Sequence, residues 1–150
     1  CTGKGHLSSY LSGRGLAQLI RSKKKHNPEF LQDWQIGSTS DDMVVLKSFV
    51  EAVHKHDVFA WEILNFSAAK LAFLIHVISG TFAVDRYVLV GSVAHSLGED
   101  LRTAVTQQLA EIGVWRWDES RLAALIRLGI QDDDIGLLGA AKYGLTRLGP

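Results

Sequence analysis

Cysteine and proline are scarce in this chain of 150 residues, which has one of the first and two of the second. A single cysteine cannot form an internal disulfide, so the fold does not depend on one. Net charge is also lacking, because 16 basic side chains balance 16 acidic ones. Together with 47% hydrophobic residues, this composition excludes disordered, collagen-like and coiled-coil chains and indicates one folded domain over residues 1–150.

The chain also lacks an uninterrupted apolar run of about 20 residues, which a membrane span needs. Its most apolar stretch covers residues 57–79. Polar residues interrupt that stretch at Glu62, Asn65, Lys70 and His76. We therefore expect a helix that is buried on most of its circumference and does not enter a membrane, with Trp61, Phe66 and Phe73 in the core.

A starting methionine is absent, because the chain begins at Cys1 and its only methionine is Met43. We expect from this a processed product or a piece of a longer protein. Cys1 and His6 are also candidate zinc ligands, with glycines between them that permit a tight turn. A structural zinc site needs four ligands, so these two residues supply at most half of one.

Although the net charge is zero, the N-terminal segment is basic. Residues 1–28 contain six basic side chains and no acidic one, so the other residues are mildly acidic. Such a segment can contact phosphate, nucleic acid or an acidic partner. We favour a simpler interpretation, in which Arg21 and Lys23 to Lys25 end a helix, where cations complement the helix dipole and stay in water.

The spacing of apolar residues predicts helices and two short strands. The expected helices cover residues 7–24, 42–55 (capped by 38–42), 57–79, 97–112 and the stretch after 132–134, with a short helical turn within 29–37. The expected strands cover residues 86–91 and 122–130, although a helical turn at 119–124 fits the second range equally well. The order strand, helix, strand, helix predicts a parallel pair with a right-handed crossover, and we expect the first strand to be covered on both faces.

The turn after the first strand is the main candidate site. Val90, Gly91 and Ser92 precede a helix, and phosphate binds where free backbone N–H groups face such a turn. The signal is weak, because the turn lacks the lysine of a P-loop and the three glycines of a dinucleotide fingerprint. The six histidines form no ligand pattern, since His54 and His56 fall on different helix faces and the others stand alone. No serine or cysteine nucleophile with its base is recognisable.

Three motifs in order resemble the ROK family (repressors, open reading frames, sugar kinases). Residues 1–13 follow the family pattern Cys-Gly-x-x-Gly-Cys-Leu-Glu-x-Tyr-x-Ser-Gly without a gap. Residues 87–93 resemble its hydrophobic strand followed by Gly-Gly-Gly-Val, and residues 135–141 resemble its closing Ala-Gly-Leu-Ile-Gly-Ala-Ala helix. The resemblance covers essentially the whole chain.

The resemblance implies an α/β fold, namely the C-terminal lobe of a two-lobed, ribonuclease-H-like (actin-like ATPase) sugar kinase. In such kinases the lobes close on ATP and a hexose, and a sugar hydroxyl attacks the γ-phosphate with the help of Mg²⁺ and a carboxylate base. That base, the first phosphate loop and two zinc ligands belong to an N-terminal lobe upstream of Cys1, so this chain alone is expected to be inactive. A cytoplasmic location and a homodimer, to which the apolar helix contributes, are also implied.

The resemblance assigns residues as well. It implies ATP binding at Gly91 and Ser92, sugar binding at Ser8, and zinc binding at Cys1 and His6. Ser8 stands where the family has glutamate, His6 where it has cysteine, and Val90 and Ser92 where it has glycine. These substitutions leave two alternatives open. One is a degenerate homologue or the non-catalytic sugar-sensing domain of a repressor, which binds nucleic acid through another segment, and the other is an unrelated α/β domain.

Overall fold

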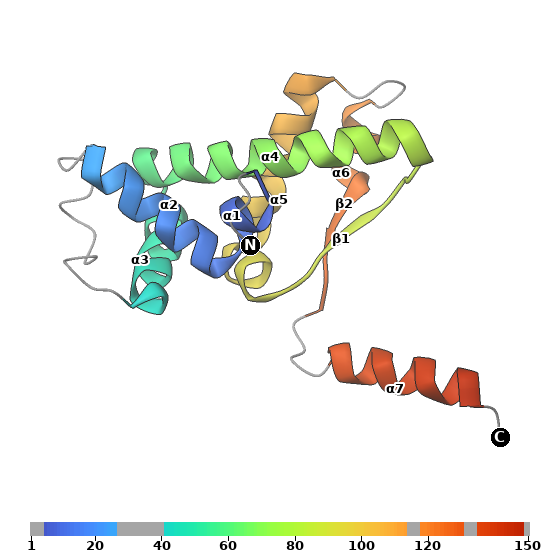
Figure 1. The fold of residues 1–150 in the computed structure, drawn as a ribbon. Helices are drawn as coiled ribbons and strands as arrows, with labels where there is room; N and C mark the ends of the chain where they lie inside the picture. The colour runs from blue at the N-terminus through green and yellow to red at the C-terminus, as the bar shows by residue number, and fades with distance from the viewer. Residues whose placement is uncertain (1–4, 27–40, 114–117, 131–134, 149–150) are drawn as a thin grey trace.

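The computed structural model describes residues 5–26, 41–113, 118–130 and 135–148 and shows a group of helices with one small sheet at its side (Figure 1). In chain order the elements are α1 (Ser8–Leu11), α2 (Gly13–His26), α3 (Asp42–His54), α4 (Val58–Phe82), β1 (Tyr87–Leu89), α5 (Ser92–Ile112), α6 (Glu119–Leu125), β2 (Ile126–Leu128) and α7 (Ile135–Leu148). The helical turn expected within 29–37 and the acidic cap expected at 132–134 lie outside the described residues.

The first expected helix is divided into α1 and α2. Ser12 separates them with extended backbone angles, φ −82° and ψ 156°. Its Oγ accepts a hydrogen bond from the backbone N of Gly15 at 3.1 Å, so Ser12 caps the start of α2. The prediction of one continuous helix was wrong because this local serine cap outweighed the apolar periodicity.

Aspartate caps begin the next two helices. Asp41 Oδ1 accepts a hydrogen bond from the backbone N of Met43 at 2.8 Å, which confirms the predicted start of α3. Asp57 Oδ1 accepts one from the backbone N of Ala60 at 2.8 Å and begins α4. The chain reverses sharply between the two helices, and Trp61 Nε1 donates to the Val53 carbonyl at 3.0 Å across this reversal.

One face of α4 is exposed, so the prediction of a helix buried on most sides was wrong. Trp61 packs partly buried against the core, but Phe73 is 63% exposed and Phe66 is also exposed. Lys70 lies over the Phe66 ring, 4.6 Å from its centroid, and shields it partly from water. Within the described ranges α4 is the one helix long and apolar enough to cross a membrane, a test that core helices of soluble proteins also pass.

The core lies between α4 and α5, with α2 and α3 closing one end. Ala60, Ala68 and Ala72 of α4 are completely buried and allow close approach of a neighbouring helix. The largest fully buried side chains are Phe49, Leu16, Ile20, Ile63, Leu64, Ile75, Leu97, Leu109, Leu125 and Ile126. Helices α2, α3, α4, α5 and α6 therefore contribute to one continuous core.

The parallel strand pair is confirmed, with Tyr87 opposite Ile126 and Leu89 opposite Leu128. Both strands are shorter than predicted. The first is not covered on both faces, because Val88 is 54% exposed. The range 122–130 divides into the end of α6 and β2, as the helical alternative allowed.

Asp118 caps α6 by accepting a hydrogen bond from the backbone N of Arg121 at 2.9 Å. The hydroxyl of Ser120 donates to the same carboxylate at 2.7 Å. Both hydrogen bonds stabilise the ionised carboxylate and lower the pKa of Asp118 below its usual value, and the hydrogen bond from Ser120 has the larger effect. The carboxyl group therefore has a structural explanation as a helix cap.

The fifth helix begins earlier than predicted and contains a break. It starts at Ser92 rather than near residue 97, and Gly98 interrupts it with φ 53° and ψ −129°. Only glycine adopts such angles readily, so the helix consists of a first segment, residues 92–97, and a longer second one. The first segment is the part that follows the candidate turn.

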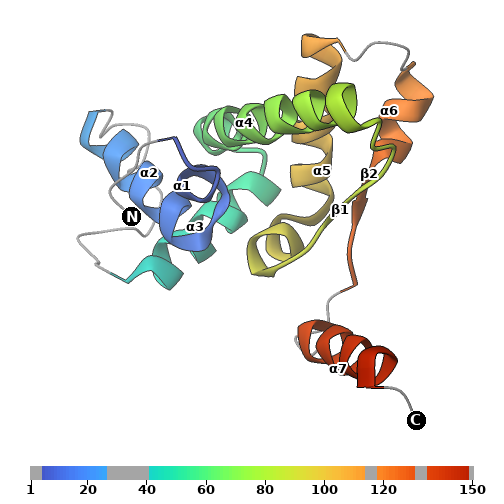
Figure 2. The same cartoon turned by 45° about the vertical axis from the view of Figure 1, so that its right-hand side comes forward.

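The last helix, α7, lies apart from the other helices in both views (Figure 1, Figure 2). Its apolar side chains are exposed, including Leu137, Leu138, Tyr143 and Leu145, which is 76% exposed. The sequence predicted the helix but not that its leucines would remain outside the core. A helix of 14 residues is only marginally stable in water on its own.

Candidate functional site

The candidate turn lies where the sequence predicted, between the end of β1 and the start of α5. No side chain caps this helix start, and its first backbone hydrogen bond runs from His95 N to the Gly91 carbonyl at 2.9 Å. The N–H groups of Ser92, Val93 and Ala94 therefore have no partner within the helix. Such N–H groups, together with the positive end of the helix dipole, form an arrangement that binds anions.

Glycine is required at position 91 by the backbone rather than by space. Gly91 has φ +100°, and a Cβ added there would meet no atom within 4 Å. The neighbouring strand is more crowded, since a Cβ added at Gly129 would lie 2.6 Å from Val90 Cγ1. The backbone N of Gly129 also donates to the Leu89 carbonyl at 2.8 Å, which extends the strand pairing to the turn.

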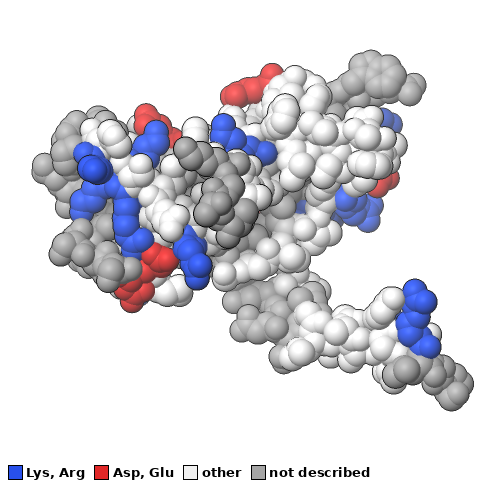
Figure 3. Space-filling view, in the orientation of Figure 1, with Lys and Arg blue, Asp and Glu red and all other residues white. Residues whose placement is uncertain are grey.

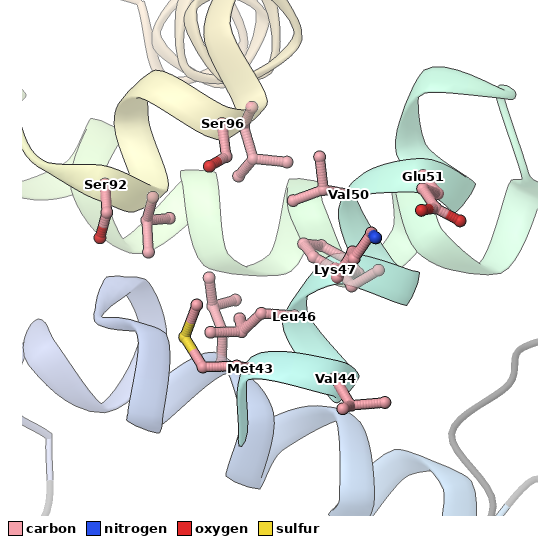
Figure 4. Close-up of a pocket in the computed structure, with 12 residues that line it drawn as sticks. Met43, Val44, Leu46, Lys47, Val50, Glu51, Ser92 and Ser96 are labelled. Carbon is pink, nitrogen blue, oxygen red and sulfur yellow. The ribbon is translucent and has the colours of Figure 1, made fainter. Parts of the chain in front are cut away.

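A groove of about 560 Å³ opens beside the turn, between α3 and the first segment of α5 (Figure 4). Its wall on α5 includes Ser92 and Ser96, and the charged side chains Lys47 and Glu51 lie on the opposite wall, on α3. The remaining lining is apolar and consists of Leu16, Met43, Val44, Leu46, Phe49, Val50, Val93 and Leu97. An apolar groove with a few polar groups at its edge is typical of sites that bind small organic ligands.

A second cavity of about 450 Å³ lies on the other side of the turn. It brings Ser12 and Gly13, at the junction of α1 and α2, to the same space as Gly91 and Ser92. Ser8 does not line this cavity and is exposed on α1. The structure therefore brings the first and second motifs together, but through Ser12 and Gly13 rather than through the predicted sugar-binding residue Ser8.

The zinc ligands expected at the N-terminus find no support in the described part of the chain. Cys1 lies outside the described residues, and His6 is exposed. No group of three or more His, Cys, Asp or Glu side chains that could hold a metal ion occurs among the residues that the structure describes. Because a structural zinc site needs four ligands, His6 alone does not form one.

The basic segment ends α2, as the simpler interpretation predicted. Lys23, Lys24 and Lys25 lie in its last turn, and Lys and Arg side chains gather over this helix (Figure 3). Arg21 forms an ion pair with Asp42 at 2.6 Å, which joins α2 to the start of α3. Part of the segment thus serves the packing of helices.

The wall of the groove on α3 was missed by sequence reasoning. Residues 43–51 were interpreted only as an amphipathic helix, because their spacing is what a core helix also shows. They lie 40 to 48 positions before Gly91 in the sequence, and only the tertiary packing of α3 against α5 brings the two together.

Comparisons with known proteins agree with the motifs. The sequence pattern of the ROK family matches residues 1–145. The chain is 30% identical over 152 aligned positions to two proteins named C(7)-cyclitol 7-kinase, from Streptomyces hygroscopicus subsp. limoneus and from Streptomyces hygroscopicus subsp. jinggangensis (strain 5008). Each alignment covers 99% of this chain and 43% of the relative, so the chain spans less than half the length of these relatives. The match over nearly its whole length shows that the chain belongs to the ROK family.

Proposed function

We propose that this chain is the nucleotide-binding, C-terminal lobe of an ATP-dependent kinase that phosphorylates a hydroxyl group of a sugar or a cyclitol. The groove that leads to the Gly91 turn carries the proposal, because it offers an apolar wall and free backbone N–H groups to one ligand. Family membership and the names of the two relatives support a kinase over the repressor alternative. The cyclitol in those names adds this substrate class to the hexose expected from the sequence.

The groove fits the nucleoside of ATP. Val50, Val93 and Leu97 offer apolar contacts to the base, while Ser92 and Ser96 supply hydroxyl groups near the turn. The N–H groups that begin α5 would face the phosphates. Among the described residues, no hydrogen bond or ion pair uses the side chain of Lys47 or Glu51, so both side chains are available to the ribose or the phosphates at the rim.

The reaction is a phosphoryl transfer. The acceptor hydroxyl oxygen forms a bond to the γ-phosphorus, the bond from that phosphorus to the bridging oxygen breaks, and ADP leaves. The hydroxyl proton passes to a carboxylate base, which we place in the second lobe. Mg²⁺ supplies charge neutralisation at the phosphates when it is bound. The residues of this chain position ATP, so the isolated chain is expected to bind ATP without turning it over.

Replacing Gly91 tests this proposal. We expect Gly91→Ala to weaken binding of ATP with Mg²⁺ by about tenfold, because alanine is strained at φ +100° and the turn would have to move. Gly113→Ala is the matched control, since Gly113 ends the same helix with φ +75° and equally open surroundings. Isothermal titration calorimetry on the chain gives both affinities, and equal losses in the two variants would contradict a binding role for the turn.

Activity is tested on the full-length gene product with ATP, Mg²⁺ and a panel of hexoses and cyclitols. We expect ADP release above background with at least one of these acceptors. Release with a cyclitol but with no hexose would identify the cyclitol as the substrate class. Absence of release with every acceptor would contradict the kinase proposal.

The exposed face of α7 is proposed to dock on the second lobe. Its leucines are exposed here, and the relatives have more than half of their length outside the aligned region. Removing residues 131–150 should therefore change the melting temperature of the isolated chain by less than about 2 °C, because α7 buries little of the core. Differential scanning calorimetry gives this value, and a fall of more than about 5 °C would show that α7 packs on this lobe instead.

A second copy of the chain and a cytoplasmic location complete the proposal. Phe66, Phe73 and Val77 expose apolar surface on one face of α4, which suits a homodimer contact. The proposed kinase reaction uses ATP, which supports a cytoplasmic location for the protein. Zinc is not part of the proposal, because no group of three or more side chains that could hold a metal ion occurs among the described residues.

A further inference from the structure

His54 joins the two walls of the groove through both nitrogens of its ring. It lies in the last turn of α3, and its Nδ1 is 2.8 Å from Asp100 Oδ2 on α5. Its Nε2 is 3.2 Å from the backbone carbonyl of Ser96. The His54 side chain is 49% exposed and that of Asp100 is 24% exposed, so the contact is open to solvent on one side.

The contact spans the break in α5. Ser96 and Asp100 lie two residues before and two residues after Gly98, whose angles are not helical. One imidazole ring therefore holds the end of the first segment and the start of the second against α3. Without such a connection, the two segments could change their angle at the glycine.

Both partners of the ring accept hydrogen bonds. A backbone carbonyl cannot donate, and an ionised carboxylate cannot donate either. A neutral imidazole donates from one nitrogen only, so its other nitrogen would face an acceptor with a lone pair. The observed geometry is complete only when His54 carries protons on both nitrogens.

The first segment of α5 carries the functional side of the groove. Ser92, Val93 and Ser96 line it, and the free N–H groups of the turn begin it. The opposite wall belongs to α3, the helix that ends at His54. The contact at His54 therefore connects the two walls.

We propose that doubly protonated His54 is a positioning residue that holds the first segment of α5 against α3 and so sets the groove and the turn for the nucleotide. Its meaning for catalysis rests on the proposed function, whereas the contact itself does not. Loss of one proton at higher pH removes one of the two hydrogen bonds and loosens the segment at Gly98. Nucleotide binding is thus expected to weaken as the imidazole loses its charge.

Several charged groups lie near the ring on α3 and α5. Asp100 is the carboxylate in direct contact with it. Glu99, the other acid near the break, forms its own ion pair with Arg102. Other ionisable residues on the nearby turns of the two helices and in the turn after α3 are Glu51, Lys55, His56, Asp57 and His95.

Nuclear magnetic resonance of the isotope-labelled chain tests the contact without nucleotide. Between about pH 5 and about pH 8, the range in which histidine changes charge, we expect the amide signals of residues 92–97 to shift together with the ring nitrogens of His54. In His54→Gln this coupled shift should disappear. His95→Gln removes an exposed imidazole from the same segment and is the matched control, in which the shift should remain. The proposal would be overturned if the amide signals of residues 92–97 did not change with pH, or if they changed equally in His54→Gln.

Binding of ATP with Mg²⁺ tests the consequence. Relative to His54→Gln, which corrects for the titration of ATP itself, the unsubstituted chain should bind about threefold more weakly at about pH 8.5 than at about pH 6. Asp100→Asn should also reduce the pH dependence, because it removes the charge that the ring faces. If the amide signals follow His54 but neither the unsubstituted chain nor His54→Gln binds ATP, the proposed function is contradicted and the positioning role of His54 is retained. If the unsubstituted chain and His54→Gln bind ATP with the same pH dependence, the proposed nucleotide-binding function is retained and the positioning role of His54 is contradicted.

Discussion

Gly15→Ala is expected to lower the free energy of unfolding by about 2 kcal/mol, because overpacked sites cost about 1–3 kcal/mol. A Cβ at this position would lie 2.2 Å from the carbonyl oxygen of Ser8 and 2.6 Å from the backbone carbon of Ser9. Both are backbone atoms of α1, so the short helix must move away from α2. Urea unfolding followed by circular dichroism at about pH 7 gives the free energy.

Gly80→Ala is the matched control. Gly80 also lies inside a helix, but a Cβ there would meet no atom within 4 Å. We expect this substitution to raise the free energy of unfolding by about 0.5–1 kcal/mol, since alanine loses less backbone entropy on folding. Two variants with the same sign would show that helix propensity, and not the contact with α1, decides the effect at Gly15.

The two glycines illustrate what the sequence could and could not predict. Gly13 and Gly15 were expected only to weaken a helix in its middle, because propensity treats every internal glycine alike. The structure shows that Gly15 is buried under α1 and that Ser12, three residues before it, caps the start of a new helix. The distinction depends on which backbone approaches the glycine, and a single sequence does not contain that information.

Local sequence patterns predicted most of the helices, the parallel strand pair and the position of the candidate turn. Asp41 capped the predicted helix, and the turn at Gly91 joined the predicted strand to a helix. Hydrophobic spacing and capping chemistry act within a few residues, so they can be read along the chain.

The groove could not be predicted because its two walls come from distant segments. Lys47 and Glu51 belong to α3, whereas Ser92 and Ser96 belong to α5. Sequence reasoning likewise gave His54 no role beyond lying on a different helix face from His56, because its partners lie 42 and 46 residues later. Spacing rules apply within one element and do not extend to such pairs.

The long helix shows a related limit. Its overall hydropathy predicted burial on most sides, but the number of apolar residues exceeds what α5 and its neighbours cover. Apolar residues are also common on protein surfaces, so composition alone cannot assign the face of a helix. Phe66 and Phe73 were therefore placed in the core by a rule that holds only on average.

Replacing Phe49 should have the largest effect on stability. Phe49 of α3 is completely buried and is among the largest enclosed side chains of the core. We expect Phe49→Ala to lower the free energy of unfolding by about 3–5 kcal/mol, from lost apolar contacts and the cavity that remains. The same residue lines the groove, so any protein that still folds should also bind ATP with Mg²⁺ more weakly.

Phe73→Ala is the control that separates burial from residue type. Phe73 of α4 is 63% exposed, so its truncation should change the free energy of unfolding by less than about 0.5 kcal/mol. Urea unfolding at low protein concentration keeps a homodimer contact on α4 from contributing to this value. If the two phenylalanine variants lost equal stability, Phe73 would belong to the core as the sequence suggested, and the packing of α4 described above would be wrong. A large difference would instead place the core on the α3 and α5 side of the molecule, where the groove also lies, and would leave the exposed face of α4 available to a partner.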